Sequence, residues 1–306
     1  MENHKHQEIN IIDLLSHLVK YKYLITFLTL SLSLILIAVL LVTPNKFESK
    51  ATFYVSSDPG STSSSMRLLS SLSSLGGMSN FSLPTSEVAK YDIVLSKIKS
   101  RDFLEILISN KEIKANIYAA KDFDFVTNSI VYDESLYNAS KGNFYNKKGS
   151  IISSPDIDDI HKKYLKMVST SRNKSTGIIS ISFVHFSPYF AADMIDTIII
   201  NLDNGARKDA INELNKSVAY FESKLLVTNE ATLKASLNTL MKSKLEQLML
   251  ANVRENFLIN TISAPFVPKY KSAPKKSLIA IVGFLISIII SILISFSYHF
   301  FIKKSD

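Results

Sequence analysis

The residues that commonly perform catalysis are scattered through this chain of 306 residues. No pair of histidines has metal-binding spacing such as H-E-x-x-H, and the chain has no cysteine, which excludes thiol catalysis, disulfides and cysteine-based zinc sites. One dense group of carboxylates follows Pro155, and in that position it is more typical of a solvated turn than of an acid/base pair. These carboxylates are Asp156, Asp158 and Asp159.

Motifs that activate a nucleophile or hold a phosphate are also absent from the sequence. There is no G-x-S-x-G, and the eight glycines form no G-x-x-x-x-G-K-[ST] phosphate-binding loop. We therefore expect a protein that is not an enzyme, with no catalytic residues, no cofactor and no bound metal.

Two uncharged segments near the ends of the sequence dominate its organisation. Residues 24–43 are twenty in a row without a charge, which as a helix would span ~30 Å, the thickness of a membrane's hydrocarbon core. Residues 277–302 form a second uncharged run of 26 residues, with His299 counted as neutral. A soluble helix buried over that length would be very unusual. We expect transmembrane helices at 24–43 and 278–302.

The first segment could instead be a cleaved signal peptide. The apolar core of a signal peptide is usually about 7–15 residues and precedes a cleavage site of small residues. Here the run is longer and continues into Pro44, Asn45 and Lys46, so we favour a membrane span. Two spans place the termini, 1–23 and 303–306, on one side and residues 44–277 on the other.

Charge gives divided evidence on orientation, because lysines flank both ends of each span. Long loops cross membranes largely regardless of their charge, which favours termini inside. The loop carries a net charge of +7, but an exported domain would rarely meet nucleic acid, so we expect no nucleic-acid partner. Four lysines beside the second span could contact lipid phosphates, or could only anchor the helix end by snorkelling. They are Lys269, Lys271, Lys275 and Lys276.

Local patterns predict a mixture of helices and strands in the loop. Alternating Ile179, Ile181 and Phe183 indicate a half-buried strand, and His185 at its end is expected to be structural. No prediction is made for 111–155. The other expected elements are an amphipathic helix at 8–23, a strand at 51–55, a serine-rich loop at 56–86, one or two helices at 85–110 and a strand at 260–267.

The longest expected soluble element is a helix over about 188–256. Ser187 and Pro188 form a natural helix start, and from Tyr189 to Ala264 there is no proline and only one glycine. Apolar residues recur at steps of three and four, as on one helix face. Unbroken, it would be on the order of 100 Å long, although Val227–Asn229 could interrupt it. So long a helix needs neighbours to cover its apolar stripe, which indicates packing on other helices of the chain or self-association.

The second span also carries a repeated small residue. Small side chains at intervals of four lie on one helix face and allow another helix to approach closely. They are Gly283, Ser287, Ser291 and Ser295, with Thr29 and Ser33 of the first span as one candidate partner face. Chance is the alternative, because serine is common in membrane helices.

The order of these features resembles the Wzz polysaccharide co-polymerases, the O-antigen chain-length determinants of Gram-negative inner membranes. The resemblance rests on IIDLL at 11–15, the span and strand that follow, the long helix, and APFVPKYKSAPKK at 264–276 joined to the second span. It covers roughly 8–60 and 176–300, whereas 60–175 fits in length and helical character only. The proline-rich return contains Pro265, Pro268 and Pro274. Ser287 stands where the family has its second membrane glycine.

The resemblance implies an α+β membrane protein with two transmembrane helices flanking a periplasmic domain. That domain would have an α/β base near the membrane and a very long protruding helix. It further implies a bell-shaped homo-oligomer that acts with the O-antigen polymerase on lipid-linked polysaccharide. Such a protein sets the modal length of the product as a non-catalytic scaffold in the inner membrane, where it contacts membrane lipids.

Two alternatives remain open at the level of sequence. The chain could serve capsule or exopolysaccharide assembly and export, with a separate kinase and export channel. It could also be a two-span periplasmic sensor. Only four residues follow the second span, so we expect neither a fused kinase nor the output domain of a sensor.

Overall fold

The computed structural model describes residues 20–56, 87–146 and 148–303. The amphipathic helix expected at 8–23 and the serine-rich loop expected at 56–86 lie almost entirely outside these residues. The chain divides into two compact units, one formed by Met1–Lys46 with Lys271–Asp306 and the other by Phe47–Tyr270. Each unit is described by itself.

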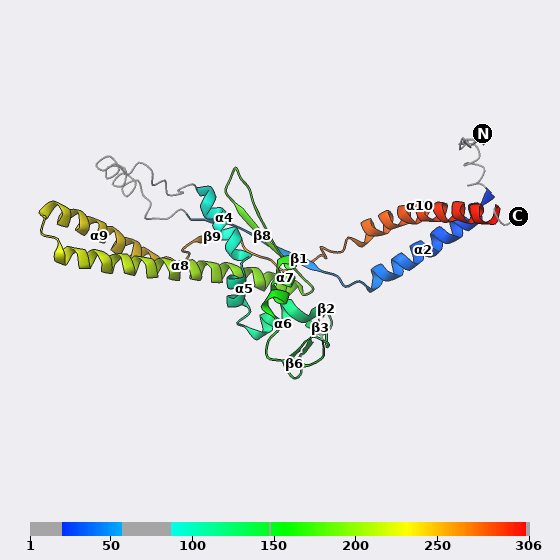
Figure 1. Cartoon of the computed structure of the whole chain (residues 1–306), viewed down its shortest axis with the longest axis horizontal. Coiled ribbons are helices and arrows are strands. Elements are labelled where there is room, and N and C mark those ends of the chain that lie inside the picture. The colour runs from blue at the N-terminus through cyan, green and yellow to red at the C-terminus, as the bar shows by residue number, and fades with distance from the viewer. Residues whose placement is uncertain (1–19, 57–86, 147, 304–306) are drawn as a thin grey trace, which may run out of the picture. The chain divides into compact units, whose positions relative to one another are not determined.

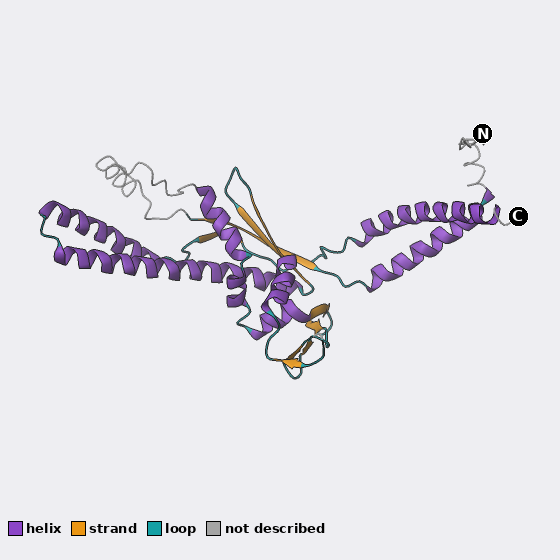
Figure 2. Cartoon of the chain, viewed as in Figure 1, coloured by secondary structure: helices purple, strands orange, loops and turns teal. Residues whose placement is uncertain are grey.

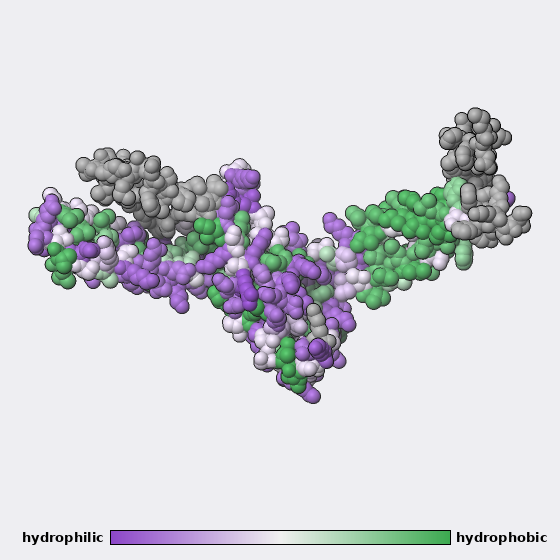
Figure 3. All heavy atoms as spheres, in the orientation of Figure 1, coloured by the Kyte–Doolittle hydropathy of each residue, from purple (hydrophilic) through white to green (hydrophobic). Residues whose placement is uncertain are grey.

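The first unit contains two long apolar helices, α2 (Lys22–Val42) and α10 (Lys276–Lys303), which pack against each other. Both are long and apolar enough to cross a membrane, with mean hydropathies of 2.8 and 3.0 over their spans. Figure 3 shows their surface as almost uniformly hydrophobic on the visible face. The expected pair of apolar helices is confirmed, and the pair fits a two-pass membrane protein.

The second unit is built on a four-stranded antiparallel sheet in the order β7-β8-β1-β9 (Figure 1). The predicted alternation of β8 is confirmed, because Ile179, Ile181 and Phe183 are fully buried. Phe53 of β1 pairs with Ile179 and is also fully buried, so both central strands bury one face, as expected when a pleated sheet is covered on one side. The strands are β1 (Phe47–Val55), β7 (Val168–Arg172), β8 (Ile179–His185) and β9 (Ile259–Ser263).

Helices cover that buried face of the sheet. α8 (Pro188–Val227) contacts β1 and β8 through the buried residues of its first turns, among them Ala191, Ile195 and Ile198. As predicted, Ser187 caps this helix: its side chain accepts a hydrogen bond from the Phe190 N–H. The shorter helices α4 (Glu87–Ile98), α5 (Arg101–Leu107) and α7 (Ile157–Met167) complete the core.

The long helix expected over 188–256 is corrected to two helices. α8 ends at Val227, and α9 (Ala231–Val253) folds back along it as an antiparallel hairpin (Figures 1 and 2). Thr228 and Glu230 are in extended conformations between them, and the Thr228 hydroxyl donates to the Lys224 carbonyl. The turn lets the second half of the apolar stripe pack on the first, which a single helix could not do. With 40 residues, α8 is still a long helix of ~60 Å, and the α+β class is confirmed.

The segment for which the sequence predicts nothing, 111–155, forms one helix and five short strands. They are α6 (Lys111–Ala119), the hairpin β2 (Ala120–Asp124) and β3 (Ser129–Tyr132), and a three-stranded sheet of β4 (Tyr137–Asn138), β5 (Asn143–Tyr145) and β6 (Ile151–Ile152). The expected helical stretch at 85–110 is two helices, α4 and α5.

Candidate functional site

The small residues of α10 form a buried seam against α2. The side chains of Ser291 and Ser295 are fully buried, and Ser287 is 5% exposed. Gly283 is buried on the same face, as its spacing of four requires. In contrast, the large apolar residues on the other faces of α10, such as Ile286 and Leu293, are exposed.

Hydroxyl groups link the two helices at the centre of the seam. Thr29 Oγ1 lies 3.0 Å from Ser291 Oγ and 2.8 Å from the Ile25 carbonyl oxygen. The Ser291 and Ser287 hydroxyls donate to carbonyls one turn earlier on α10, at 2.7 and 2.8 Å. The interior of a membrane holds no water that could form hydrogen bonds with these hydroxyl groups. In such an environment they must bond to each other or to backbone carbonyls, as they do here.

The helices pack closely at Gly283. A Cβ atom added there would lie 2.6 Å from Leu36 Cδ1, so a larger residue requires the Leu36 side chain or the helices to shift. Ser287, which replaces the expected second glycine, is accommodated because its hydroxyl bonds to the Gly283 carbonyl of its own helix. Ser33, the other proposed partner of the seam, donates to the Leu30 carbonyl of α2 instead.

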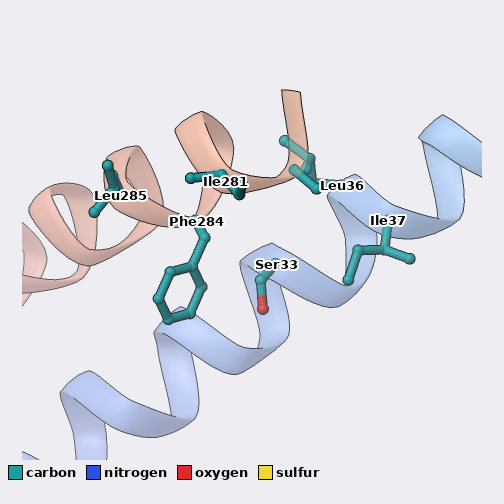
Figure 4. Close-up of a pocket in the computed structure, with 7 residues that line it drawn as sticks. Ser33, Leu36, Ile37, Ile281, Phe284 and Leu285 are labelled. Atoms are coloured by element: carbon teal, nitrogen blue, oxygen red, sulfur yellow. The ribbon is translucent and has the colours of Figure 1, made fainter. Parts of the chain in front are cut away.

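Beside this contact the two helices enclose an apolar groove, shown in Figure 4. Its volume is about 430 Å³. Phe284 extends from α10 toward α2 next to Ser33, whose hydroxyl is already bonded within its own helix. The groove therefore presents an almost wholly apolar surface. Its lining residues are Ser33, Leu36, Ile37, Ala280, Ile281, Phe284 and Leu285.

The proline-rich return runs through both units. Within the second unit, Pro268 is buried and Pro265 half-buried, and the Ser49 hydroxyl of β1 donates to the Phe266 carbonyl at 2.8 Å. Within the first unit, Pro274 is half-buried and follows Ala273, which forms an antiparallel β-bridge with Lys46. The return is thus held in the larger unit by a side-chain hydrogen bond and in the helix-pair unit by backbone hydrogen bonds.

The four lysines of the return are not brought together in one cluster. Lys269 belongs to the larger unit, and Lys271, Lys275 and Lys276 belong to the helix pair. Lys276 Nζ donates to the Thr43 carbonyl at 2.9 Å, which joins the end of α2 to the start of α10, whereas Lys271 and Lys275 are exposed.

A charge pair that no motif in the sequence predicted, a buried aspartate with a half-buried arginine, lies at the base of the helical hairpin. Asp203 of α8, 7% exposed, accepts the backbone N–H groups of three consecutive residues, Phe257, Leu258 and Ile259. Arg207 lies 3.3 Å from the Asp203 carboxylate and donates to the carbonyls of residues 254 and 255. These contacts fix the chain where it leaves α9 and enters β9. The i,i+4 Asp/Arg spacing was the only signal in the sequence.

Two opposing effects act on the pKa of Asp203. Burial raises it, but the three backbone N–H donors and the Arg207 guanidinium outweigh burial and hold the pKa below its ordinary value. The carboxylate is therefore charged at neutral pH and acts as a structural acceptor.

The remaining candidates for chemistry are structural in the described residues. His185 is buried, with Nε2 3.0 Å from the Asn116 carbonyl oxygen and Nδ1 accepting the Ser187 N–H. Asp156 caps α7 by accepting the Asp158 N–H, so the acidic group is a helix start. Within residues 20–56, 87–146 and 148–303, no three potential metal ligands of the His, Cys, Asp and Glu types come together.

Comparison with known families gives one match in the N-terminal third of the chain. Residues 7–111 match the family described as Wzz, chain length determinant protein. This range contains α2, β1, α4 and α5 but neither the proline-rich return nor α10. No curated protein sequence matches the chain.

Similar solved structures include two polysaccharide co-polymerases. One is described as a full-length bacterial polysaccharide co-polymerase, with 12% identity and a TM-score of 0.42, covering 96% of this chain and 99% of the other. The second is a fragment of WzzB, a polysaccharide co-polymerase from Salmonella Typhimurium, with 13% identity and a TM-score of 0.32, covering 75% of this chain and all of the fragment. At these TM-scores the likeness carries no argument about function.

Proposed function

We propose that this Wzz-type polysaccharide co-polymerase regulates the modal chain length of O-antigen lipopolysaccharide. The observation that carries the proposal is the match of residues 7–111 to the chain-length-determinant family. The two apolar helices, which precede and follow an α+β unit in the sequence, support it, because this order fits a protein held at the membrane where lipid-linked glycans are assembled.

The proposed mechanism is non-catalytic. Several copies of the chain would form a scaffold in the inner membrane of a Gram-negative bacterium, with the larger unit in the periplasm. The scaffold would bind the polymerase or the growing glycan and change the point at which extension stops. Many weak contacts can respond to polymer length, because avidity depends on the distance that a chain must span.

The surface of the helical hairpin supports assembly of several copies. Near the turn between α8 and α9, Leu226 and Val227 are 87% and 71% exposed, and Leu233 in the first turn of α9 is 49% exposed. Apolar side chains grouped on an exposed helix pair are typical of a surface that another protein covers.

A clean deletion with complementation tests the pathway as well as the activity. Lipopolysaccharide and surface capsule are measured in the parent, the deletion strain and the complemented strain. If a clustered band distribution collapses to a random ladder and returns on complementation, the O-antigen assignment holds. An unchanged ladder with loss of capsule would overturn it and assign the chain to capsule or exopolysaccharide export.

A further inference from the structure

Lys276 lies one helical turn from the apolar groove between α2 and α10. Lys276, Ala280 and Phe284 follow one another at intervals of four, so they lie along one face of α10 and lead from the lysine into the groove. Lys276 uses one of its three donors on the Thr43 carbonyl, which holds its ammonium group at the end of the helix pair. The groove and the cation are therefore neighbours within one unit.

Lysines give this end of the helix pair a positive charge. Lys271, Lys275 and Lys276 all belong to this unit, and its described segments, 20–46 and 271–303, contain no aspartate or glutamate. Lys271 and Lys275 are exposed. The chemistry of the site is thus an apolar channel with a cationic rim, which is complementary to an anionic amphiphile.

We propose that this groove binds an anionic membrane phospholipid, with an acyl chain against Ala280 and Phe284 and the phosphate at the lysines. The volume of about 430 Å³ lies within the range of roughly 300–1,000 Å³ that is typical of small-molecule sites. Lysines at the end of a membrane helix meet anionic headgroups directly.

A second copy of the helix pair is a poorer occupant for the same surface. The corresponding segments of another copy would bring further lysines against this rim and no carboxylate to neutralise them. Lipid binding also does not depend on the proposed function, because it is measured without any polysaccharide.

Native mass spectrometry of the full chain tests the site. The protein is released from detergent with added phosphatidylglycerol, phosphatidylcholine of matched acyl chains, or a polyprenyl phosphate. The wild type is expected to retain phosphatidylglycerol in preference to phosphatidylcholine. Lys271→Gln and Lys275→Gln should each reduce this preference roughly fivefold, since each removes one surface cation. Ala280→Phe, which fills the groove, should lower retention of both lipids.

Lys20→Gln with Lys22→Gln is the matched control, because these lysines lie beside the opposite end of α2. The control should keep the lipid preference. Ser33→Leu fills the groove from the other helix and repeats the test if Ala280→Phe does not fold. Equal retention of the two lipids by the wild type, an equal loss in the control, or preferential retention of a polyprenyl phosphate would each overturn the proposal.

Discussion

At the scale of single residues, the Asp203 carboxylate accepts several hydrogen bonds at one point of the larger unit. It joins α8 to the start of β9 through three backbone N–H groups and Arg207. Its three backbone partners are more than fifty positions away in sequence, so no local pattern could reveal them. A sequence predicts such a contact only when the fold that brings the segments together is already known.

We expect Asp203→Ala to lower the free energy of unfolding of the larger unit by about 3 kcal/mol, because it leaves buried donors and a half-buried guanidinium without their acceptor. Asp209→Ala is the control on the same helix. Asp209 is exposed and pairs with Lys97 at 3.2 Å, so its loss should cost less than about 1 kcal/mol. Urea unfolding of the full chain in detergent, followed by circular dichroism, measures both.

The same carboxylate predicts a dependence on pH. Because its pKa is lower in the folded protein, its contribution is complete above the ordinary pKa of about 4 and is lost as the pH falls through the lower, folded value. The difference in stability between wild type and Asp203→Ala should therefore be constant near neutral pH and shrink in acid. A difference that grew in acid would contradict this assignment.

At the scale of elements, the sequence predicted what depends on local pattern. The start of α8 at Ser187–Pro188, the alternation of β8 and the apolar lengths of α2 and α10 follow from capping, pleat and hydropathy. The sequence did not predict the residue at which α8 ends. The β-branched residues Val227 and Thr228 lower helix propensity, but they do not specify a turn. The very short strands between 120 and 152 depend on tertiary contacts and carry no periodicity.

The seam between α2 and α10 predicts a specific cross-link. Because the chain has no cysteine, Thr29→Cys with Ser291→Cys introduces the only two thiols, at positions whose hydroxyl oxygens are 3.0 Å apart. We expect a disulfide within one chain on mild oxidation in membranes, measured as a mobility shift on non-reducing gels. Thr29→Cys with Ile290→Cys is the control, since Ile290 is 40% exposed. Equal cross-linking of the two pairs would contradict the seam.

Close packing at Gly283 predicts an effect of side-chain size on the polymer. Gly283→Leu should separate the helices and shift the length distribution without abolishing polymer, since a Cβ already meets Leu36. Leu36→Ala should partly restore the distribution by making room. Val282→Leu, at an exposed neighbour, is the control and should leave it unchanged. Lipopolysaccharide gels measure all three, and an identical shift in the control would exclude packing as the cause.

At the scale of the whole molecule, the sequence indicated that apolar helix surface must be covered by other helices or other copies. Part of it is covered within the chain, where α9 packs on α8, and part remains exposed. The sequence did not predict which apolar residues are covered within the chain and which remain exposed, because both sets recur at the same steps of three and four along the helices.

The exposed part predicts a role in assembly. Leu226→Ser with Val227→Ser should leave the fold intact, because both side chains are largely exposed, and should reduce the size of the oligomer. Light scattering of the full chain in detergent measures the mass. Leu214→Ser is the contrasting variant: Leu214 is buried, so this change should destabilise the fold itself. An unchanged mass for the first variant would exclude this surface from assembly.

We propose that the protein controls polymer length and does not synthesise polymer. Measuring total O-antigen repeat units and their length distribution together, in the deletion strain and in the parent, tests this directly. Total synthesis is expected to persist in the deletion strain, while the clustered length distribution becomes random and short. Loss of all polymer in the deletion strain, with the polymerase still present at its normal level, would contradict it and indicate a direct role in synthesis.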